Sequence, residues 1–187
     1  MRIISGTLRG RKLHAIHGIA IRPTADRVRE SIFNILFSQV LDAVVLDLFA
    51  GTGAFGIEAL SRGAESSVFI DNSRNAVSVI KKNILTCRIE DRSRIILWNI
   101  INNLNCLKSS SSLFNLVFMD PPYNQNLIIP ALHNLHQSRS LEKGACIVAE
   151  HSDSEPIPEN ISAFTITDQR KYGNTLVSFL EYIGSGN

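Results

Sequence analysis

The segment Asp47-Leu48-Phe49-Ala50-Gly51-Thr52-Gly53-Ala54-Phe55-Gly56 decides the fold of this 187-residue chain. It continues the apolar run 44–49, which predicts a buried strand, and it leads into 54–62, which has the length and apolar spacing of a helix. Gly51 and Gly53 permit a tight turn and let a ligand approach the backbone closely. The segment therefore predicts the first strand, turn and helix of an α/β sheet.

The chain beyond this turn continues the alternation of strands and helices. Apolar runs of strand length are separated by amphipathic stretches of helical period. Strands that are apolar on both faces and alternate with helices are typical of a parallel sheet, and two runs after residue 150 predict an antiparallel hairpin. We expect a doubly wound, mostly parallel seven-stranded sheet with an antiparallel C-terminal edge, the strands at 44–49, 67–71, 94–98, 116–119, 145–150, 163–167 and 176–182 and the helices at 54–62, 74–86, 100–107 and 126–137.

The N-terminal part differs in composition from the rest. A helix is expected over 25–38, where Val28, Ile32, Ile35 and Leu36 recur at helical spacing and Thr24 is placed as the N-cap. Residues 1–21 are basic and glycine-dotted, and we expect them either to form a short hairpin or to stay mobile. We expect a basic N-terminal extension and helix over 1–38, followed by the α/β domain over 39–187.

Charge is unevenly distributed along the chain, although the net charge is only +2. Residues 1–30 hold seven basic and two acidic side chains, whereas the remaining residues hold 12 basic and 15 acidic ones. A basic segment ahead of a mildly acidic body favours a polyanionic partner whose phosphates the segment contacts. A solvated N-terminal segment without a partner would have the same composition, so both interpretations stay open.

Composition also bounds the compartment and the chemistry. No apolar run approaches the ~20 residues of a membrane span, and Met1–Gly6 lacks the apolar stretch of a secretory signal. The three cysteines, an odd number without CxxC spacing, are expected to be reduced and buried. We therefore expect a cytoplasmic protein that holds no metal. His133 and His136, three apart on a predicted helix, are expected to face solvent because no third ligand lies at useful spacing.

The glycine turn itself is compatible with two cofactor classes and with a plain structural turn. Gly51-x-Gly53-x-x-Gly56 matches the dinucleotide fingerprint, and Asp71, 20 residues after Gly51, can hydrogen-bond ribose in either cofactor. Asp47 favours S-adenosylmethionine, because a carboxylate here would repel phosphates but attract a sulfonium and an ammonium.

The same edge of the sheet is expected to hold the rest of the cofactor. Asn99 lies just past the third predicted strand, where an amide can contact the adenine amino group, although a polar residue at a helix start explains it equally well. Trp98 is expected to pack in the core, with the border of the adenine pocket as an alternative. The expected cofactor residues are Asp47, Phe49, Ala50, Gly51, Thr52, Gly53, Asp71, Asn72 and Asn99.

Asp120-Pro121-Pro122-Tyr123 ends another predicted strand, so Asp120 and Asp47 should face one crevice at the carboxyl edge of the sheet. A nucleobase amino group is a poor nucleophile, and two acceptors can draw its nitrogen toward tetrahedral geometry. Asp120 and the Pro121 carbonyl are the predicted acceptors, Pro122 stiffens the turn, and Tyr123 stacks on the base. A strand followed by a proline turn with a capping aspartate is the structural alternative.

With these residues in view, the chain resembles the RsmD family of bacterial 16S rRNA guanine-N2 methyltransferases nearly end to end. The segments up to residue 30 are specific to that family, whereas the glycine turn and D-P-P-Y are shared by many amino-methylating enzymes. The resemblance is carried by Ile4–Gly6, Arg9–Leu13, Arg22–Glu30, Asp47–Gly56, Glu58–Ala64, Asp120–Tyr123 and Tyr172–Thr175.

This resemblance implies a Rossmann-like class I fold and methyl transfer from S-adenosylmethionine to guanine N2 in 16S rRNA, with an assembling small subunit as partner. A monomer is expected. Asp71 stands where relatives often have Glu, which shortens its reach. The resemblance assigns RNA binding to Arg9, Arg11, Lys12, Arg22, Thr24, Arg27 and Arg29, with an ordinary solvated or salt-bridged side chain as the less favoured alternative for each.

Three other functions fit the sequence less well. An adenine-N6 or cytosine-N4 DNA methyltransferase would use the same tetrapeptide, but the chain has no room for a separate target-recognition domain. A catalytically silent RNA-binding assembly factor has no need of an intact Asp120 and glycine turn. An NAD-linked reductase would leave D-P-P-Y without a task.

Overall fold

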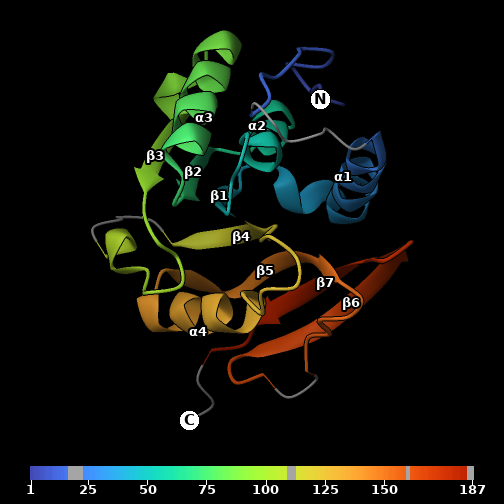
Figure 1. The fold of residues 1–187 in the computed structure, drawn as a ribbon. Coiled ribbons are helices and arrows are strands. Elements are labelled where there is room, and N and C mark those ends of the chain that lie inside the picture. Colours follow the sequence, from blue (N-terminus) through green and yellow to red (C-terminus); the bar gives the residue numbers. More distant parts are fainter. Residues whose placement is uncertain (17–22, 109–112, 159–160, 185–187) are drawn as a thin grey trace.

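The computed structural model describes residues 1–16, 23–108, 113–158 and 161–184. One sheet runs through these residues, with the strand order β3-β2-β1-β4-β5-β7-β6 (Figure 1). The strands are β1 (Val44–Leu48), β2 (Ser66–Asp71), β3 (Ser93–Leu97), β4 (Phe114–Met119), β5 (Leu141–Ser152), β6 (Phe164–Tyr172) and β7 (Thr175–Tyr182). The helices are α1 (Pro23–Leu36), α2 (Ala54–Ser61), α3 (Arg74–Cys87) and α4 (Ile128–Ser138), with short 3-10 turns at Phe37–Val40, Glu90–Arg92 and Asn105–Leu107.

The sheet has the predicted topology. Strands β1 to β5 are parallel, and β7 enters antiparallel between β5 and β6. In register, Asp47 pairs with Phe118, and Leu48 pairs with Met119, the residue before Asp120. The predicted fold class is confirmed, and the turn after β1 and the tetrapeptide after β4 leave the same edge of the sheet.

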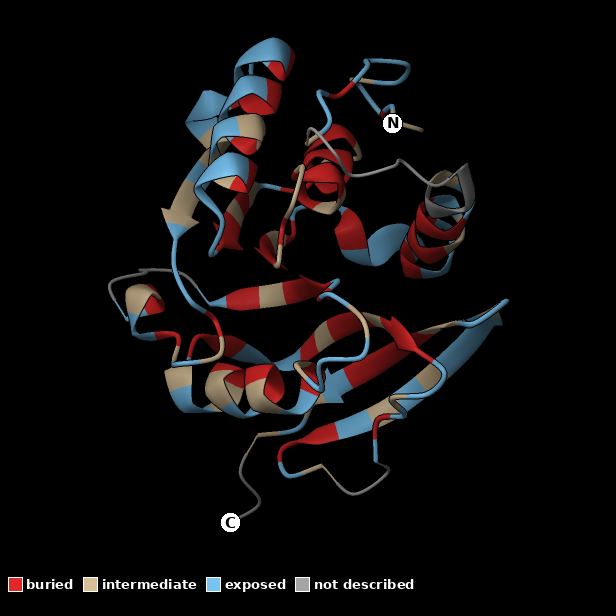
Figure 2. Ribbon diagram, in the orientation of Figure 1, coloured by how far each residue is buried: buried red, intermediate tan, exposed pale blue. Residues whose placement is uncertain are grey.

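Two hydrophobic cores cover the two faces of the sheet. One includes Val45 of β1 with side chains of α1, α2 and α3, and the other includes Leu46 and Leu48 with side chains of α4. Figure 2 shows α1, α3 and α4 buried on the side that faces the sheet and exposed on the other, whereas α2 is buried along nearly its whole length. Because both faces are covered, the parallel strands are apolar at successive positions, as their sequences are.

The helix expected at 100–107 is reduced to the 3-10 turn Asn105–Leu107, so that prediction is wrong. Ile100, Leu104 and Leu107 are buried at the helical spacing that suggested it. Asparagine side chains compete with the helix for backbone N–H groups. Asn99 Oδ1 accepts from Ile101 N at 3.1 Å, and Asn103 Oδ1 accepts from Asn105 N at 2.9 Å.

Helix α1 begins earlier than expected, at Pro23. Proline is favoured in the first helical turn because its missing N–H has no partner there in any case. Thr24 therefore lies inside the helix, and its prediction as the N-cap is wrong. No helix in the described parts of the chain combines the length and the apolarity of a membrane span.

The first residues form the hairpin that was one of the two expectations for this region. Ile3 N donates to Arg11 O at 2.9 Å, and Gly10 N donates to Ile3 O at 2.9 Å. The hairpin is seated on α2, where a Cβ on Gly6 would lie 1.8 Å from Ser61 O. Part of the expected 1–21 segment, residues 17–21, lies outside the described residues. A boundary at 38/39 stays a prediction.

Candidate active site

The turn after β1 is held by an acid from the next strand. Gly51 and Gly53 have φ angles of 56° and 77°, a region that glycine enters without strain. Asp71, at the end of β2, accepts from Gly51 N at 2.9 Å through Oδ2 and from Ser73 N at 2.8 Å through Oδ1. Asp71 was predicted as a ribose acceptor, and the structure shows that it also shapes the glycine turn. Each carboxylate oxygen keeps a second lone pair for a ligand hydroxyl.

Asp47 lies below this turn and is only 2% exposed. Its Oδ2 accepts from Gly56 N at 2.9 Å. Burial raises the pKa of Asp47 to about 8, the Gly56 hydrogen bond opposes that rise, and the charge of Asp71 adds to it. A cation bound beside the carboxyl group would favour its ionised form.

Gly56 is needed for the contact between α2 and β2. A Cβ at this position would lie 2.3 Å from Cε1 of the Phe69 ring and 2.5 Å from Ser67 Oγ. The third glycine of the sequence pattern therefore lets the helix lie close to the sheet. This brings the N-terminus of α2 to the carboxyl edge of β1.

The other predicted cofactor residues surround the same edge. Trp98 is 36% exposed, and its indole N–H donates to Asn103 O at 2.9 Å, so the prediction that it packs in the core is wrong. Asn72 and Asn99 are exposed, Phe49, Gly51 and Thr52 are half-buried, and Ala50 and Gly53 are buried.

The catalytic candidate Asp120 follows β4 directly and is exposed, whereas Pro121 behind it is buried. Although the residue as a whole is exposed, its carboxyl group lies among protein atoms; this burial raises the pKa of Asp120, and the charges of Glu150 and Asp47 raise it further. The effect of Asp47 on this pKa agrees with the shared edge that the strand register shows. Two of the acids that the sequence singled out thus belong to one site.

Tyr123 is anchored through its hydroxyl group. The hydroxyl donates to Glu150 Oε1 of β5 at 2.6 Å and lies 3.1 Å from Thr175 Oγ1 of β7. Burial, together with the hydrogen bond to Glu150, raises the pKa of Tyr123 above its usual range, so the phenol stays protonated. Sequence reasoning missed Glu150 altogether. Thr175 could have been noticed, because it ends the family segment Tyr172–Thr175.

The loop after the tetrapeptide is clamped by the connection from β5 to β6. Asn124 and Asn126 have φ angles of 58° and 52°, in the left-handed region. The Glu155 carboxylate accepts from both of their backbone N–H groups, with 2.5 Å to Asn126 N. Ser154 Oγ donates to Asn124 Oδ1 at 2.9 Å. No pattern in the sequence indicates this role of Glu155. A cavity of about 190 Å³ lies between this loop and the β5–β6 connection, lined in part by Pro122, Tyr123, His151, Glu155 and Ile157.

The β6–β7 hairpin joins α1 to this loop. Its tip extends toward α1 (Figure 1). There the Tyr172 hydroxyl hydrogen-bonds Ser31 Oγ of α1, while Thr175 contacts Tyr123. Asn174 O accepts from Asp153 N at 3.0 Å, which ties the tip to the end of β5.

The predicted RNA-binding residues divide into surface and core. Arg9, Arg11, Lys12 and Arg27 are exposed. Arg29 is 2% exposed, and its Nη2 donates to Arg2 O at 2.7 Å and to Asp26 Oδ1 at 3.1 Å. The prediction that Arg29 contacts RNA is therefore corrected, because its guanidinium is occupied inside the protein. Arg22 lies outside the described residues, and so does the side chain of Thr24.

Arg29 instead belongs to a buried acid–base cluster around Glu58, which is 0% exposed. Glu58 accepts from Ile4 N at 2.8 Å, Ser5 N at 3.0 Å and Arg62 Nε at 2.8 Å. A buried carboxylate requires such partners, and here they fasten the N-terminal hairpin to α2. Sequence reasoning missed this role of Glu58.

His133 and His136 were the histidines considered as metal ligands. No group of three or more metal-binding side chains occurs among the described residues. His133 is exposed. His136 is half-buried, with Nδ1 3.1 Å from the Tyr182 hydroxyl, so the prediction of a solvent-facing pair holds for His133 only.

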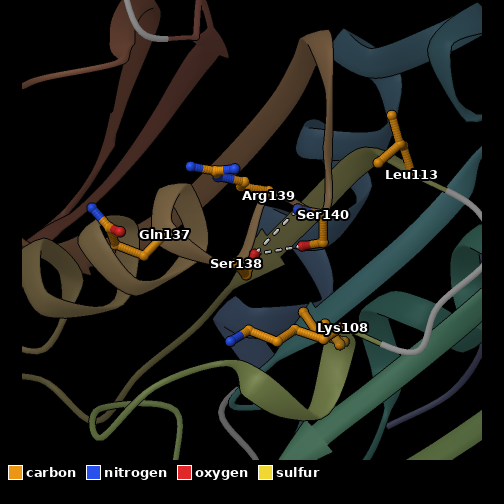
Figure 3. Close-up of a pocket in the computed structure, with 7 residues that line it drawn as sticks. Lys108, Leu113, Gln137, Ser138, Arg139 and Ser140 are labelled. Carbon is orange, nitrogen blue, oxygen red and sulfur yellow. Dashed lines mark hydrogen bonds between the residues drawn. The ribbon is translucent and has the colours of Figure 1, made fainter.

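A second cavity, of about 480 Å³, lies at the other end of the sheet (Figure 3). It is lined by the end of α4 and the residue before β4, and it includes none of the predicted site residues. Its lining residues are Leu107, Lys108, Leu113, Gln137, Ser138, Arg139 and Ser140.

A seven-stranded sheet of this order, with a glycine turn after β1 and an acidic D-P-P-Y tip after β4, defines a Rossmann-like methyltransferase. The solved structure of the Escherichia coli protein yhhF has the same fold, with a TM-score of 0.85 and 31% identity over 99% of both chains. Residues 1–181 match the model of the family described as "Conserved hypothetical protein 95", the RsmD family, and the chain belongs to that family.

Named relatives cover nearly the same length. Ribosomal RNA small subunit methyltransferase D of Haemophilus influenzae is 35% identical, over 97% of this chain and 93% of its own. The Escherichia coli protein of the same name is 36% identical, over 84% of this chain and 78% of its own. The Bacillus subtilis protein YlbH is 35% identical, over 98% of this chain and all of its own.

Proposed function

We propose that this protein transfers a methyl group from S-adenosylmethionine to the exocyclic N2 amine of a guanine in 16S rRNA. The observation that carries the proposal is the meeting of Asp47 and Asp120 at one edge of adjacent parallel strands. The two relatives named ribosomal RNA small subunit methyltransferase D support rRNA as the substrate. An assembling small subunit as the acceptor and a monomeric enzyme in the cytoplasm are part of the same proposal.

The donor set at the glycine turn fits S-adenosylmethionine. Asp47 is a buried acid whose raised pKa falls when a cation binds nearby. Asp71 offers acceptor lone pairs to ribose hydroxyls, and the exposed side chain of Asn99 is available to adenine. When bound, the cofactor supplies an electrophilic methyl group on a positively charged sulfur. These side chains would bind and orient it beside Asp120.

The acceptor base would be held by the tetrapeptide. The two N–H groups of the amine donate hydrogen bonds to the Asp120 carboxylate and to the Pro121 carbonyl, which directs the nitrogen lone pair toward the methyl carbon. Methyl transfer leaves the nitrogen positively charged, and this cation is a far stronger acid than the neutral amine, so Asp120 takes up the proton that it sheds. Tyr123, anchored on Glu150 and Thr175, presents its ring as a stacking surface for the base.

Transfer of labelled methyl groups from S-adenosylmethionine tests the proposal. The acceptors are naked 16S rRNA, immature small subunits from cells lacking the enzyme, and duplex DNA. We expect label in rRNA or subunits, recovered as N2-methylguanosine after digestion with nuclease and phosphatase. Label in DNA alone would support the DNA methyltransferase alternative. Label in none of them, with cofactor binding intact, would support the silent assembly factor.

A further inference from the structure

Helix α3 and the N-terminal hairpin form one basic surface. Residues 1–16 and 74–88 together hold no acidic side chain, and the remainder of the chain holds 17 acidic and 11 basic ones. The eight basic side chains of the two segments are all exposed. They are Arg2, Arg9, Arg11, Lys12, Arg74, Lys81, Lys82 and Arg88.

Hydrogen bonds join the two segments directly. Arg11 Nη1 donates to Thr86 O near the end of α3, at 2.6 Å. Asn83, which is 0% exposed, accepts from His14 N at 2.7 Å and donates to His14 O at 3.1 Å. Lys82 lies one helical turn before Thr86 and therefore on the side of α3 that meets the hairpin. Arg88 follows directly at the C-cap.

None of these cations is neutralised by an ion pair among the described residues. The ion pairs in the described part of the chain are formed by Arg29, Arg62, Arg170 and Lys171, and none involves the eight side chains of this surface. Eight exposed cations that form no ion pair repel one another, which is an electrostatic cost to the folded state that the acids beyond the two ends of α3, Asp71, Glu90 and Asp91, offset only in part. A polyanion that lies across the surface would remove this cost and release condensed counterions.

We propose that the exposed face of α3, with Lys82 and Arg88, is part of the rRNA-binding surface and contacts backbone phosphates. The inference rests on the proposed function and extends the footprint beyond the N-terminal extension. Helix α3 has 14 residues and is therefore about 21 Å long. It begins at the cofactor edge of the sheet, so the basic surface extends from that edge along the length of the helix. Contacts of this kind position the RNA, and they do not depend on base sequence.

The test compares two double variants of the full-length protein. Lys82→Gln/Arg88→Gln removes two charges from the proposed surface. Arg139→Gln/Lys143→Gln removes the same two residue types from the α4 and β5 side. Arg88 and Arg139 are matched further, because both are helix C-caps in the left-handed region, with φ of 57° and 54°. The measurements are binding of a 16S rRNA fragment over a KCl series, S-adenosylmethionine affinity and melting temperature.

We expect Lys82→Gln/Arg88→Gln to weaken RNA binding about tenfold at low salt and to reduce the slope of log affinity against log salt by about 1.5, the value for two lost phosphate contacts. Cofactor affinity and melting temperature should stay at the wild-type values, and the control variant should bind RNA as the wild type does. A wild-type slope in Lys82→Gln/Arg88→Gln, or equal losses in both variants, would overturn the inference while methyl transfer to rRNA still supported the proposed function. A wild-type protein that neither binds nor methylates the RNA would overturn both.

Discussion

The cofactor edge and the catalytic loop lie side by side, yet they are held in different ways. The glycine turn is shaped by Asp71 and Asp47, which bond backbone N–H groups within residues 47–73. The loop after β4 is held by Glu150, Glu155 and Thr175, which lie 27 to 52 residues further along the chain. The first site is thus a local construction, and the second is assembled from the C-terminal third. Substitutions should therefore separate cofactor binding from methyl transfer.

The largest difference between the effect on methyl transfer and the effect on cofactor binding is expected at Asp120. Asp120→Asn keeps the size of the side chain but removes the negative acceptor and the proton acceptor. We expect kcat to fall about 10³-fold, within the range of general-base and electrostatic contributions. Cofactor affinity, measured by calorimetry, should change by less than about threefold, because removing a carboxylate needed only for the acceptor leaves the glycine turn intact. Loss of cofactor binding would mean that the two regions are not separable.

The opposite effect is expected at Asp71. Asp71→Ala leaves Gly51 N and Ser73 N without their acceptor and loosens the turn, so we expect the cofactor Kd to rise about 20-fold or more. The kcat at saturating cofactor should stay within about threefold of wild type. Asp91→Ala, at an exposed acid in the turn before β3, serves as the control. A reduced kcat with an unchanged Kd would contradict the assignment.

A smaller effect is expected in the clamp of the catalytic loop. Glu155→Ala frees Asn124 N and Asn126 N, and we expect kcat to fall about fivefold as the tetrapeptide loses its fixed geometry. Glu155→Gln keeps an acceptor and should recover part of the rate. Cofactor affinity should not change in either variant. Glu142→Gln, at an exposed position near the start of β5, is the matched control. Equal rates in all three variants would mean that the clamp does not position the loop.

The smallest effect concerns the pH dependence of cofactor binding. Burial gives the Asp47 carboxyl a pKa of about 8, so below that pH the free protein holds a proton that the charged cofactor displaces. Affinity should therefore rise about threefold from pH 7.5 to 8.5, as the carboxyl group loses its proton, and level off above this range. Asp47→Asn should flatten this profile. An affinity that falls over the same interval would show that Asp47 does not meet a cation.

Most of the architecture could be predicted because its pattern is local and repeated. Strand and helix periods from residue 44 onward predicted all seven strands and the C-terminal hairpin. The failure at 100–107 has the same local origin, since Asn99 and Asn103 capture the N–H groups that a helix needs while the apolar spacing stays helical. The spacing of apolar residues predicts which side chains are buried. It does not show that asparagine side chains compete with helix carbonyls for the backbone N–H groups.

The sequence by itself determined the parallel sheet, the glycine turn and the D-P-P-Y tip, because apolar periodicity and glycine chemistry act over a few residues. Only the tertiary structure decided that Arg29 lies in the core against Glu58 and that Glu150 and Glu155 hold the catalytic loop. It also decided that α3 joins the hairpin in one basic surface. Burial and charge pairing are properties of residues brought together from distant parts of the chain, and linear spacing does not specify them.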